Sequence, residues 1–451
     1  METIRYESTN RKSGEVSFRQ ALLMGQAPDR GLFTPTSVPK IALDELESMR
    51  NKDYAGVAFD VARRFLAGEV PERELERICR ESYNFEVPLE KAFGRLYVMR
   101  LDRGPTAAFK DFAARMMARL MSYFIGREGG KLLILTATSG DTGSAVANAF
   151  HNVKNITVVV LFPKNEVTSR QRKQMTTLGG NVTTVAVDGK FDDCQHLVKT
   201  AFADKDLSRL SLSSANSINF GRLLPQSVYY VYSYVKLYEK PGERIVFSVP
   251  SGNFGDLMGG VLAFRMGLPV ERFVVATNEN DEFPNFMKTG EYTPIRPSKA
   301  CISNAMNVGH PSNLARLFRM YGGWMDETGV VHEKPDMKAL RRDLYAVSVS
   351  DAQTRDAIKT AYNRCKLVLE PHGAVGWCGL EKYLKESGWE GLSVTLETAD
   401  PAKFPEEIVK TLGFEPHVPE SLKGLEGRIE HVEELGADYS SLKNFLQKRF
   451  S

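Results

Sequence analysis

The sequence predicts an α/β protein with doubly wound, mostly parallel sheets and an N-terminal accessory region. From Leu96 onward, short β-rich runs alternate with helical stretches, which is typical of βαβ units in a parallel sheet. Two of these β-rich runs end in similar glycine-containing turns that open a helix. Such turns lie where doubly wound folds bind their ligands.

The first part of the chain, residues 1–90, predicts the accessory domain. It contains three amphipathic helix candidates separated by Pro and Gly turns, at residues 42–49, 54–66 and 72–83. This stretch lacks the regular alternation of strands and helices that follows it.

Residues 91–451 predict a catalytic region made of two α/β subdomains. The β-rich runs that define them are residues 131–137, 156–162, 182–187, 244–249, 273–277 and 393–397. Residues 291–333 are rich in Gly, Pro and Asn and predict an insertion that interrupts the alternation. The tail, residues 403–451, returns to helical periodicity.

Composition narrows the class of function. The chain has 451 residues, with 42% hydrophobic and 25% charged residues, which is ordinary for a globular protein. A net charge of +3 and the lack of dense Lys/Arg blocks give no indication of nucleic-acid binding. No apolar run approaches the ~20 residues of a membrane helix. The five scattered cysteines form no CxxC pair and the few histidines are dispersed, so we expect reduced thiols, a cytoplasmic location and no metal site.

Lys110 is the most informative residue. It lies where a strand-like run gives way to a helix-like one, and Ala107, Ala108, Phe109 and Phe112 surround it in sequence. Partial desolvation there would lower the pKa of its ammonium group and leave an amine able to attack a carbonyl. The alternative is a lysine on the first helical turn with its head in water.

Two loops share the pattern Ser-Gly-Asp/Asn-x-Gly, at residues 139–143 and 251–255. Each follows a strand and opens a helix, so each would point backbone N–H groups and a helix dipole at an anion. Neither is a Walker A or a GxGxxG motif, which disfavours nucleotides. Glycine that serves only strand-to-helix packing remains the alternative for either loop alone.

A desolvated lysine and two anion loops fit pyridoxal phosphate (PLP) chemistry, with one loop for the cofactor phosphate and one for a substrate carboxylate. The chain resembles the threonine synthase family of fold type II PLP-dependent enzymes, which is related to the tryptophan synthase β group. The resemblance runs nearly end to end through residues 6–9, 18–33, 104–112, 214–230, 251–256, 370–376 and 398–404.

The resemblance implies a role for each matching residue. Lys110 would bind the cofactor covalently, and Thr398 would offer its hydroxyl to the pyridine nitrogen as a neutral partner that leaves this nitrogen unprotonated. The cofactor phosphate would be held by Gly252, Asn253, Phe254, Gly255 and Asp256. The substrate would be bound at its carboxylate by Ser139, Gly140, Asp141 and Thr142, and at its phosphate by Asn216, Ser217, Asn219 and Arg222. A helix-surface position is the alternative for Arg222, and a purely structural role the alternative for His372.

Two positions depart from the family pattern. Asp400 stands where His is common, and Gly373 stands where Thr is common. We expect Pro401 and the end of the preceding strand to turn the Asp400 side chain away from the cofactor, so both departures should leave cofactor binding intact.

The implied reaction converts O-phospho-L-homoserine and water to L-threonine and phosphate, the last step of threonine biosynthesis. One alternative is a related phospho-lyase that gives a keto acid, ammonia and phosphate. The other is a binding protein without activity, which the retained Lys110 disfavours. The sequence does not fix the oligomeric state.

Overall fold

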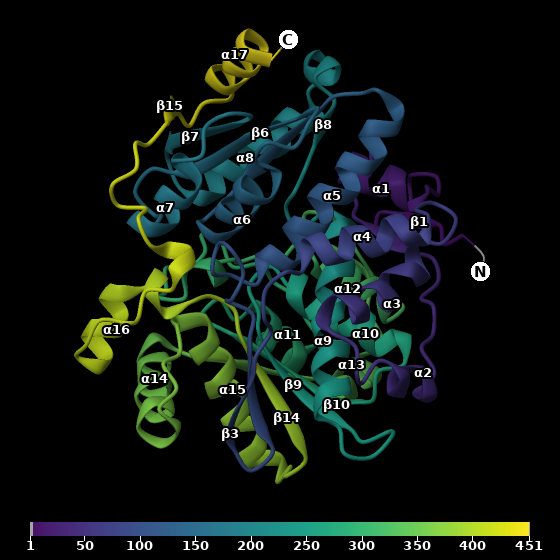
Figure 1. Ribbon diagram of the computed structural model, residues 1–451, viewed down its shortest axis with the longest axis vertical. Coiled ribbons are helices and arrows are strands. Elements are labelled where there is room, and N and C mark those ends of the chain that lie inside the picture. Colours follow the sequence, from purple (N-terminus) through teal and green to yellow (C-terminus); the bar gives the residue numbers. More distant parts are fainter. Residues whose placement is uncertain (1–2, 451) are drawn as a thin grey trace.

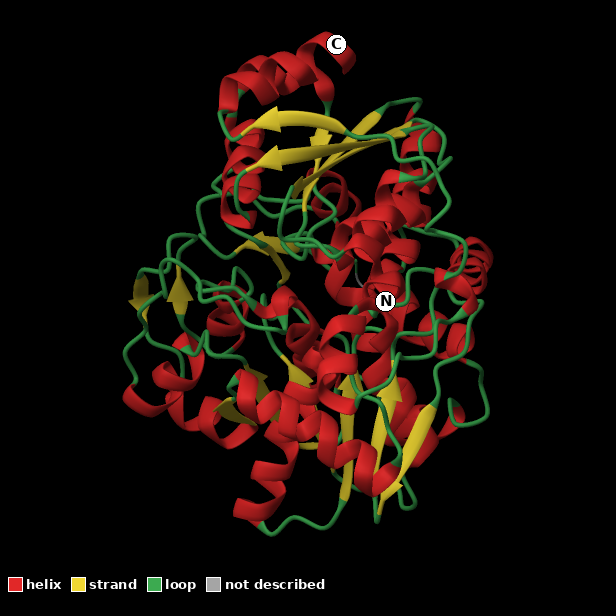
Figure 2. Ribbon diagram, turned by 90° about the vertical axis from the view of Figure 1, so that its left-hand side faces the viewer, coloured by secondary structure: helices red, strands yellow, loops and turns green. Residues whose placement is uncertain are grey.

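The computed structural model describes residues 3–450 and contains two main sheets, one above the other in Figures 1 and 2. The larger sheet has six strands and the smaller has five. The doubly wound α/β class predicted from the sequence is confirmed. Of the helices in residues 3–450, none is long and apolar enough to cross a membrane.

The larger sheet occupies the lower part of Figure 1. Its strands, in spatial order, are β13 (Leu344–Ser348), β10 (Val270–Thr277), β9 (Ile245–Pro250), β14 (Leu392–Glu397), β4 (Leu96–Arg100) and β3 (Leu89–Phe93). Neighbouring strands are parallel except for the β3–β4 hairpin at one edge. Strands β9 and β14 are buried along their whole length, as expected for a sheet covered on both faces.

Alternating residues of the larger sheet pack against two helical layers. Phe247 and Phe273 belong to the main core with α9 (Leu223–Leu237) and α10 (Gly255–Met266). On the other face, Val246 and Val274 pack with α14 (Asp351–Cys365), α15 (Pro371–Ser387) and α16 (Pro405–Leu412). The period of two along each strand therefore sorts side chains between the layers.

The smaller sheet is entirely parallel and lies in the upper part of Figure 1. Its order is β15 (Glu433–Gly436), β7 (Val182–Asp188), β6 (Ile156–Pro163), β5 (Leu132–Ala137) and β8 (Leu212–Ser213). One face packs with α5 (Lys110–Glu128), α6 (Asp141–Phe150) and α7 (Ser169–Thr176). The other packs with α8 (Phe191–Ala203) and α17 (Tyr439–Phe450).

The N-terminal region packs beside the larger sheet rather than forming a separate core. Its elements are β1 (Tyr6–Ser8), α1 (Phe18–Met24), β2 (Phe33–Pro35), α2 (Leu43–Ser48), α3 (Tyr54–Leu66) and α4 (Glu72–Ser82). Their buried side chains belong to the same hydrophobic cluster as those of α5 and α9. The boundary suggested near residue 90 falls within β3, and the division into domains stays a prediction.

The stretch expected as an insertion, residues 291–333, is mostly loop. It holds the short helix α12 (Leu314–Met320) and the two-stranded ribbon of β11 (Trp324–Met325) and β12 (Val331–Glu333). Two further short helices flank this stretch, α11 (Glu282–Thr289) and α13 (Met337–Asp343).

The tail differs from the expected helical stretch. Besides α16 and α17 it contains β15, which extends the smaller sheet by pairing with β7. β15 has the short sequence Glu-Glu-Leu-Gly and alternates exposed and half-buried residues, so it carries little of the apolar pattern that marks a buried strand. Its position depends on the β7 edge, which no local pattern reveals.

Both glycine loops lie where the strand order reverses. In the smaller sheet the chain runs from β5 to β6 and β7 on one side, while β8 returns to the other side of β5. In the larger sheet β10 lies on one side of β9 and β14 on the other. The loops after β5 and β9 are therefore at the two topological switch points, where a crevice opens at the carboxyl ends of the strands.

Candidate active site

A cavity lies at these switch points, and it is lined from both sheet units. All but two of the site residues predicted from the sequence line it; the exceptions are Gly140 and Asn219. Side chains that sequence reasoning did not assign also face it, among them Gln226, Met306 and His372.

The turn before α5 fixes the position of Lys110, the first residue of that helix. Ala107 adopts a left-handed conformation with φ of 53°. The Phe109 amide donates to the Thr398 carbonyl (2.9 Å), and the Asp400 amide donates to the Ala107 carbonyl (3.0 Å). The lysine turn is thereby tied to the end of β14.

A buried carboxylate supports the start of this turn. The amide and the hydroxyl of Thr106 donate to Asp111 at 2.8 and 2.7 Å. A Cβ on Gly104 would lie 2.4 Å from Asp111 Oδ2, so only glycine leaves room for this carboxylate. The Gly-Pro-Thr segment of the sequence therefore has a packing reason as well as a turn-forming one.

The Lys110 side chain is half-buried and faces the cavity. Burial lowers the pKa of Lys110 to about 8; the carboxylate of Asp141 opposes this shift, and the charges of Arg222 and Lys403 add to it. The side chain is therefore a free amine near neutral pH far more often than an ordinary lysine is. The desolvated position expected from the sequence is present, rather than a head group in open water.

The loop after β9 brings backbone amides to the cavity. A Cβ on Gly252 would lie 2.8 Å from the Ala305 carbonyl oxygen and from Met306 Cα, so the chain passes too close there for any side chain. Phe254 has a φ of 60°, and α10 begins at Gly255. The first amides of α10 have no acceptor within the helix and are available to an anion.

The Asp256 carboxylate in this loop is turned to the tyrosines of α9. The hydroxyls of Tyr229 and Tyr230 both donate to its Oδ1, at 2.5 and 2.7 Å. Burial raises the pKa of Asp256 to about 6 despite these hydrogen bonds and the charge of Lys110. Asp256 thus contributes a cavity wall and a backbone amide, while its side chain anchors the loop.

The loop after β5 is held by Thr138 and by a buried ion pair. Thr138 Oγ1 accepts from the amides of Gly140 (2.9 Å) and Gly143 (2.7 Å). The amides of Asp141 and Thr142, in the first turn of α6, have no acceptor within the helix. These two amides are the donors that the loop offers to a carboxylate.

The Asp141 side chain does not compete with such an anion, because its charge is already matched. Its Oδ1 lies 2.6 Å from Nζ of Lys403, which is fully buried, and it also accepts from Gln171 Nε2 (2.9 Å). Burial alone would raise the pKa of Asp141, but the charges of Lys403 and Lys110 hold it below its usual range. Lys403 also donates to the Thr106 carbonyl (2.9 Å), so it links this loop to the lysine turn.

Arg222 is buried in the cavity wall without a carboxylate partner among the described residues. One Nη donates to the Ala215 carbonyl (2.9 Å), whereas its Nε is buried without an acceptor in residues 3–450. Burial lowers the pKa of Arg222 to about 10. The helix-surface alternative is wrong, and a buried cation of this kind calls for an anionic ligand.

A second buried arginine, Arg316, supports the cavity from behind. It donates to the carbonyls of Phe33, Ser217 and Ile218 and to the side chain of Asn313. Asn313 in turn donates to the Asn253 carbonyl (3.0 Å). Arg316 therefore joins the N-terminal region, the Ser217 segment and the loop after β9.

The two predicted residues that do not line the cavity have structural tasks. Asn219 donates to the Leu22 and Ser214 carbonyls and accepts from the Gly221 amide, which uses its whole amide group. Gly140 has a φ of 137°, and a Cβ there would lie 2.5 Å from the Gln171 side chain. Both shape the neighbouring segments that do face the cavity.

The two departures from the family pattern have a physical account. A Cβ on Gly373 would lie 1.7 Å from Oε2 of the buried Glu397, so glycine is required beside this carboxyl group. Asp400 does not line the cavity; its carboxylate accepts from the Ala402 amide (2.9 Å) at the start of a short 3-10 turn. The side chain is turned away, as expected from Pro401.

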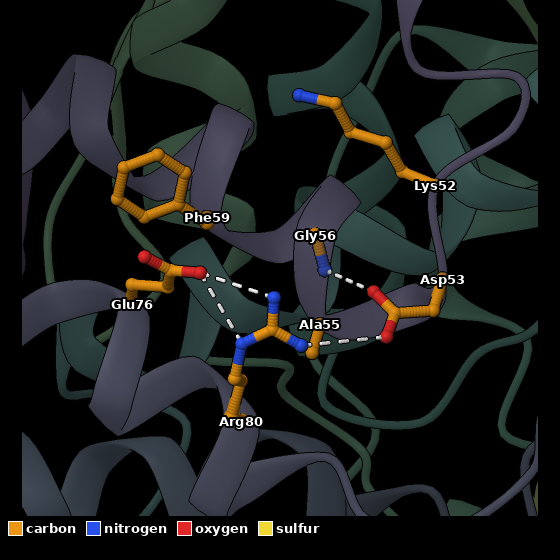
Figure 3. A pocket seen from close by; sticks show the side chains of 7 residues that line it. All are labelled: Lys52, Asp53, Ala55, Gly56, Phe59, Glu76 and Arg80. Atoms are coloured by element: carbon orange, nitrogen blue, oxygen red, sulfur yellow. Dashed lines mark hydrogen bonds and ion pairs between the residues drawn. The ribbon is translucent and has the colours of Figure 1, made fainter.

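A second hollow lies on the surface beside α3 and α4 (Figure 3). Its charged side chains are already paired: Arg80 with Glu76 (3.0 Å) and Asp53 (3.7 Å), and Lys52 with Asp60 (2.6 Å). Asp53 also accepts from the Gly56 amide (2.8 Å). Each charged side chain that lines this hollow already has an ion-pair partner, so we take the Lys110 cavity as the candidate site.

The cavity fits the cofactor that the sequence predicts. It combines a lysine with a lowered pKa, two helix N-termini, one of which approaches so closely that it requires glycine, and a buried guanidinium without a carboxylate partner among the described residues. An aldehyde and two or three anionic groups match this donor set.

Comparison with known proteins gives the same assignment over nearly the whole chain. The family model described as pyridoxal-phosphate dependent enzyme matches residues 84–396, and models for the threonine synthase N terminus and C-terminal region match residues 5–83 and 373–446. A threonine synthase of Haemophilus influenzae is 39% identical over 442 residues, covering 96% of this chain and 97% of that protein.

Solved structures are equally similar. The crystal structure of PLP-bound threonine synthase from Brucella melitensis has a TM-score of 0.91 and 34% identity, covering 99% of this chain and 100% of that one. Threonine synthase from Escherichia coli has a TM-score of 0.89 and 36% identity, covering 98% and 99% of the two chains.

Proposed function

The chain belongs to the threonine synthase family of PLP-dependent enzymes, and from this premise we propose how its cavity carries out the reaction. The enzyme is a lyase that uses PLP and converts O-phospho-L-homoserine and water to L-threonine and phosphate. The observation that best supports this reaction in the Lys110 cavity is the buried guanidinium of Arg222, which lines the same cavity and has no carboxylate partner among the described residues.

The proposed cofactor site is built from three segments. Lys110 would hold the cofactor aldehyde, the amides of residues 252–256 would hold its phosphate, and Thr398 would offer its hydroxyl to the ring, since all of these residues line one cavity. When bound, PLP supplies an electron sink for the charge that develops at the substrate Cα. The protein's own contribution is to place the sink, the base and the leaving group in one desolvated cavity.

The proposed substrate site uses other residues that line the same cavity. The amides of Asp141 and Thr142, with Ser139, bind the α-carboxylate, and Arg222 with Asn216 and Ser217 binds the phosphate. The Arg222 guanidinium then stabilises the phosphate as the Cγ–O bond breaks, because a buried charge acts strongly in a cavity with little water. Water supplies the hydroxyl group that threonine carries on Cβ.

Lys110 is the proposed general base at Cα. Once the substrate amine has displaced it from the cofactor, Lys110 must be unprotonated to take the proton from Cα, and a pKa of about 8 satisfies this near neutral pH far better than that of an ordinary lysine.

The scattered cysteines support a cytoplasmic location as part of the same proposal.

Product analysis tests the function. The purified enzyme, incubated with O-phospho-L-homoserine, should release threonine and phosphate in equal amounts. A keto acid and ammonia in place of threonine would identify the phospho-lyase alternative, which the names of the relatives do not favour.

A variant tests the role of Arg222. Hydrogen bonds to charged groups contribute about 1.5–3 kcal/mol, so Arg222→Met should weaken inhibition by inorganic phosphate about 10- to 150-fold. Arg115→Met is the control, because Arg115 is a half-buried arginine that donates to the Ser82 and Glu81 carbonyls outside the cavity. Equal phosphate inhibition in both variants would remove Arg222 from the site.

A further inference from the structure

The side-chain amide of Asn253 has a fixed orientation. The backbone amide of Ser312 lies 2.6 Å from Asn253 Oδ1. A backbone N–H can only donate, so the atom that it meets must be the oxygen, and the other atom of the side-chain amide is Nδ2. Asn253 Nδ2 donates in turn to Ser217 Oγ (2.7 Å). The Asn253 side chain therefore joins Ser312 to Ser217, while its backbone amide is the group assigned to the cofactor phosphate.

The direction of the Ser217 hydroxyl proton follows from this contact. A serine hydroxyl has one proton and two lone pairs, and one lone pair of Ser217 Oγ already accepts from Asn253 Nδ2. The proton cannot point at the incoming amide hydrogen, and no acceptor for it lies among residues 3–450. Because Ser217 lines the cavity, its proton is free to donate to a ligand there.

The stretch at residues 291–333 holds both partners in place. Asn313 Nδ2 donates to the Asn253 carbonyl (3.0 Å), and Arg316 donates to Asn313 Oδ1 (2.6 Å) and to the Ser217 carbonyl (3.0 Å). Asn313 and Arg316 are both completely buried. A Cβ on Gly255 would lie 3.0 Å from Ser217 Cβ, so Ser217 also packs closely on the start of α10. The backbone of both residues is thus fixed, and only the hydroxyl proton of Ser217 has freedom to turn.

We propose that the Asn253 side chain is a positioning residue that turns the Ser217 hydroxyl proton toward the phosphate of the bound substrate. This inference rests on the proposed function, in which Ser217 and Arg222 bind that phosphate. Phosphate oxygens are acceptors, so an aimed hydroxyl adds a second donor to that of the guanidinium. Without Asn253 the proton could occupy any of three staggered positions, of which one faces the phosphate.

The proposal also gives the stretch at residues 291–333 a task in the substrate site. Its Ser312 amide fixes the orientation of Asn253, and its Asn313 and Arg316 side chains fix the backbone that carries Asn253 and Ser217. The stretch therefore acts on the substrate phosphate through Asn253 and Ser217.

Inhibition of the holoenzyme by inorganic phosphate, at saturating PLP, tests the proposal. Ser217→Ala removes the donor and should weaken inhibition about tenfold or more. Asn253→Ala leaves the hydroxyl without its direction and should weaken inhibition about threefold. In a Ser217→Ala background, Asn253→Ala should have no further effect, because no proton remains to be aimed. An equal loss in both backgrounds would show that Asn253 acts independently of Ser217 and would overturn the proposal.

Asn253→Asp gives a second test that keeps the shape of the side chain and the acceptor for the Ser312 amide. The carboxylate replaces the donor to Ser217 with an acceptor, which takes the hydroxyl proton away from the cavity. Its charge repels phosphate in either background, so the comparison between backgrounds isolates the effect of the proton. The loss of inhibition should be about tenfold larger in the wild-type background than in Ser217→Ala, and equal losses would contradict the proposed role.

Arg222→Met separates failure of this inference from failure of the proposed function. If inhibition is unchanged in Arg222→Met, phosphate binds elsewhere, and the proposed function of this cavity is wrong together with the inference. If inhibition weakens in Arg222→Met but keeps its wild-type value in Ser217→Ala, the phosphate site is right and the role of Asn253 and Ser217 is wrong.

Discussion

The buried ion pair of Lys403 and Asp141 should be a large contributor to folding as well as to the geometry of the site. The Lys403→Met variant keeps the length of the side chain and removes its charge. Asp141 would then be a buried carboxylate without its main partner, and the Thr106 carbonyl would lose the donor that Lys403 supplies. The lysine turn and the loop after β5 would both lose an anchor.

The magnitude follows from burial. Lys403 is 0% exposed and Asp141 3% exposed, so water can replace little of the lost interaction. Removing one partner of a buried pair costs about 3–5 kcal/mol, because the remaining charge is left uncompensated. We expect a loss of this size in the free energy of unfolding, measured by urea denaturation at one fixed PLP concentration, since bound cofactor adds to stability.

The pH dependence has a defined sign. In the wild type, the pKa of Asp141 is below its unfolded value, so its contribution is present above the unfolded pKa and is lost as pH falls toward the folded pKa. In Lys403→Met, burial should raise the pKa of Asp141 above the unfolded value, and protonation at lower pH should relieve the penalty. The difference in stability between the two proteins should therefore be largest at neutral pH and shrink toward pH 4.

Lys443→Met is the matched control. Lys443 pairs with Asp204 (2.9 Å) and Asp206 on the surface, where solvent screens the charges. We expect this variant to unfold at nearly the same urea concentration as the wild type. If Lys403→Met is no more destabilised than Lys443→Met, or if its deficit does not shrink at low pH, the account of the buried pair is wrong.

Three further predictions concern the lysine and the glycines of the site. Borohydride reduction of the holoenzyme followed by peptide mapping should place the pyridoxyl group on Lys110, and a label on another lysine would refute that role. Gly252→Ala should lower PLP affinity in equilibrium dialysis because a Cβ meets backbone there, whereas Gly140→Ala should retain PLP and raise KM; equal loss of PLP would show that the loop roles are misassigned. Gly373→Ala should cost about 1–3 kcal/mol in urea unfolding, and the cost should fall in a Glu397→Ala background, so an unchanged cost would show that the two residues do not compete for space.

Much of the fold could be predicted because its signals are local. The strand at residues 156–162 was expected from its apolar run and is observed as β6 (Ile156–Pro163), and the helix expected at residues 54–66 is α3 (Tyr54–Leu66). The strands at the edges of the smaller sheet were harder to predict. β8 has two residues and β15 alternates exposed positions, so their pairing depends on a neighbouring strand rather than on their own pattern.

In the candidate site, too, some features could be predicted from the local sequence and others could not. The lysine turn and the two glycine loops follow from local chemistry, and all of them face the cavity. The residues that support these segments could not be predicted from local chemistry, because they are distant in the sequence. Lys403 pairs with Asp141, which is 262 positions away, and Arg316 donates to the carbonyl of Ser217, which is 99 positions away. Asn253 lies in a glycine loop that the sequence marks, but the contact of its side chain with Ser217 required the fold.

A crystal structure of the holoenzyme with a phosphonate analogue of O-phospho-L-homoserine tests the central claim most directly. The account predicts continuous density from Lys110 to the cofactor, the cofactor phosphate at the amides of residues 252–256, the substrate carboxylate at residues 139–142 and the phosphonate on the Arg222 guanidinium. The phosphonate on the loop after β5, or an Arg222 side chain without an anion, would contradict it.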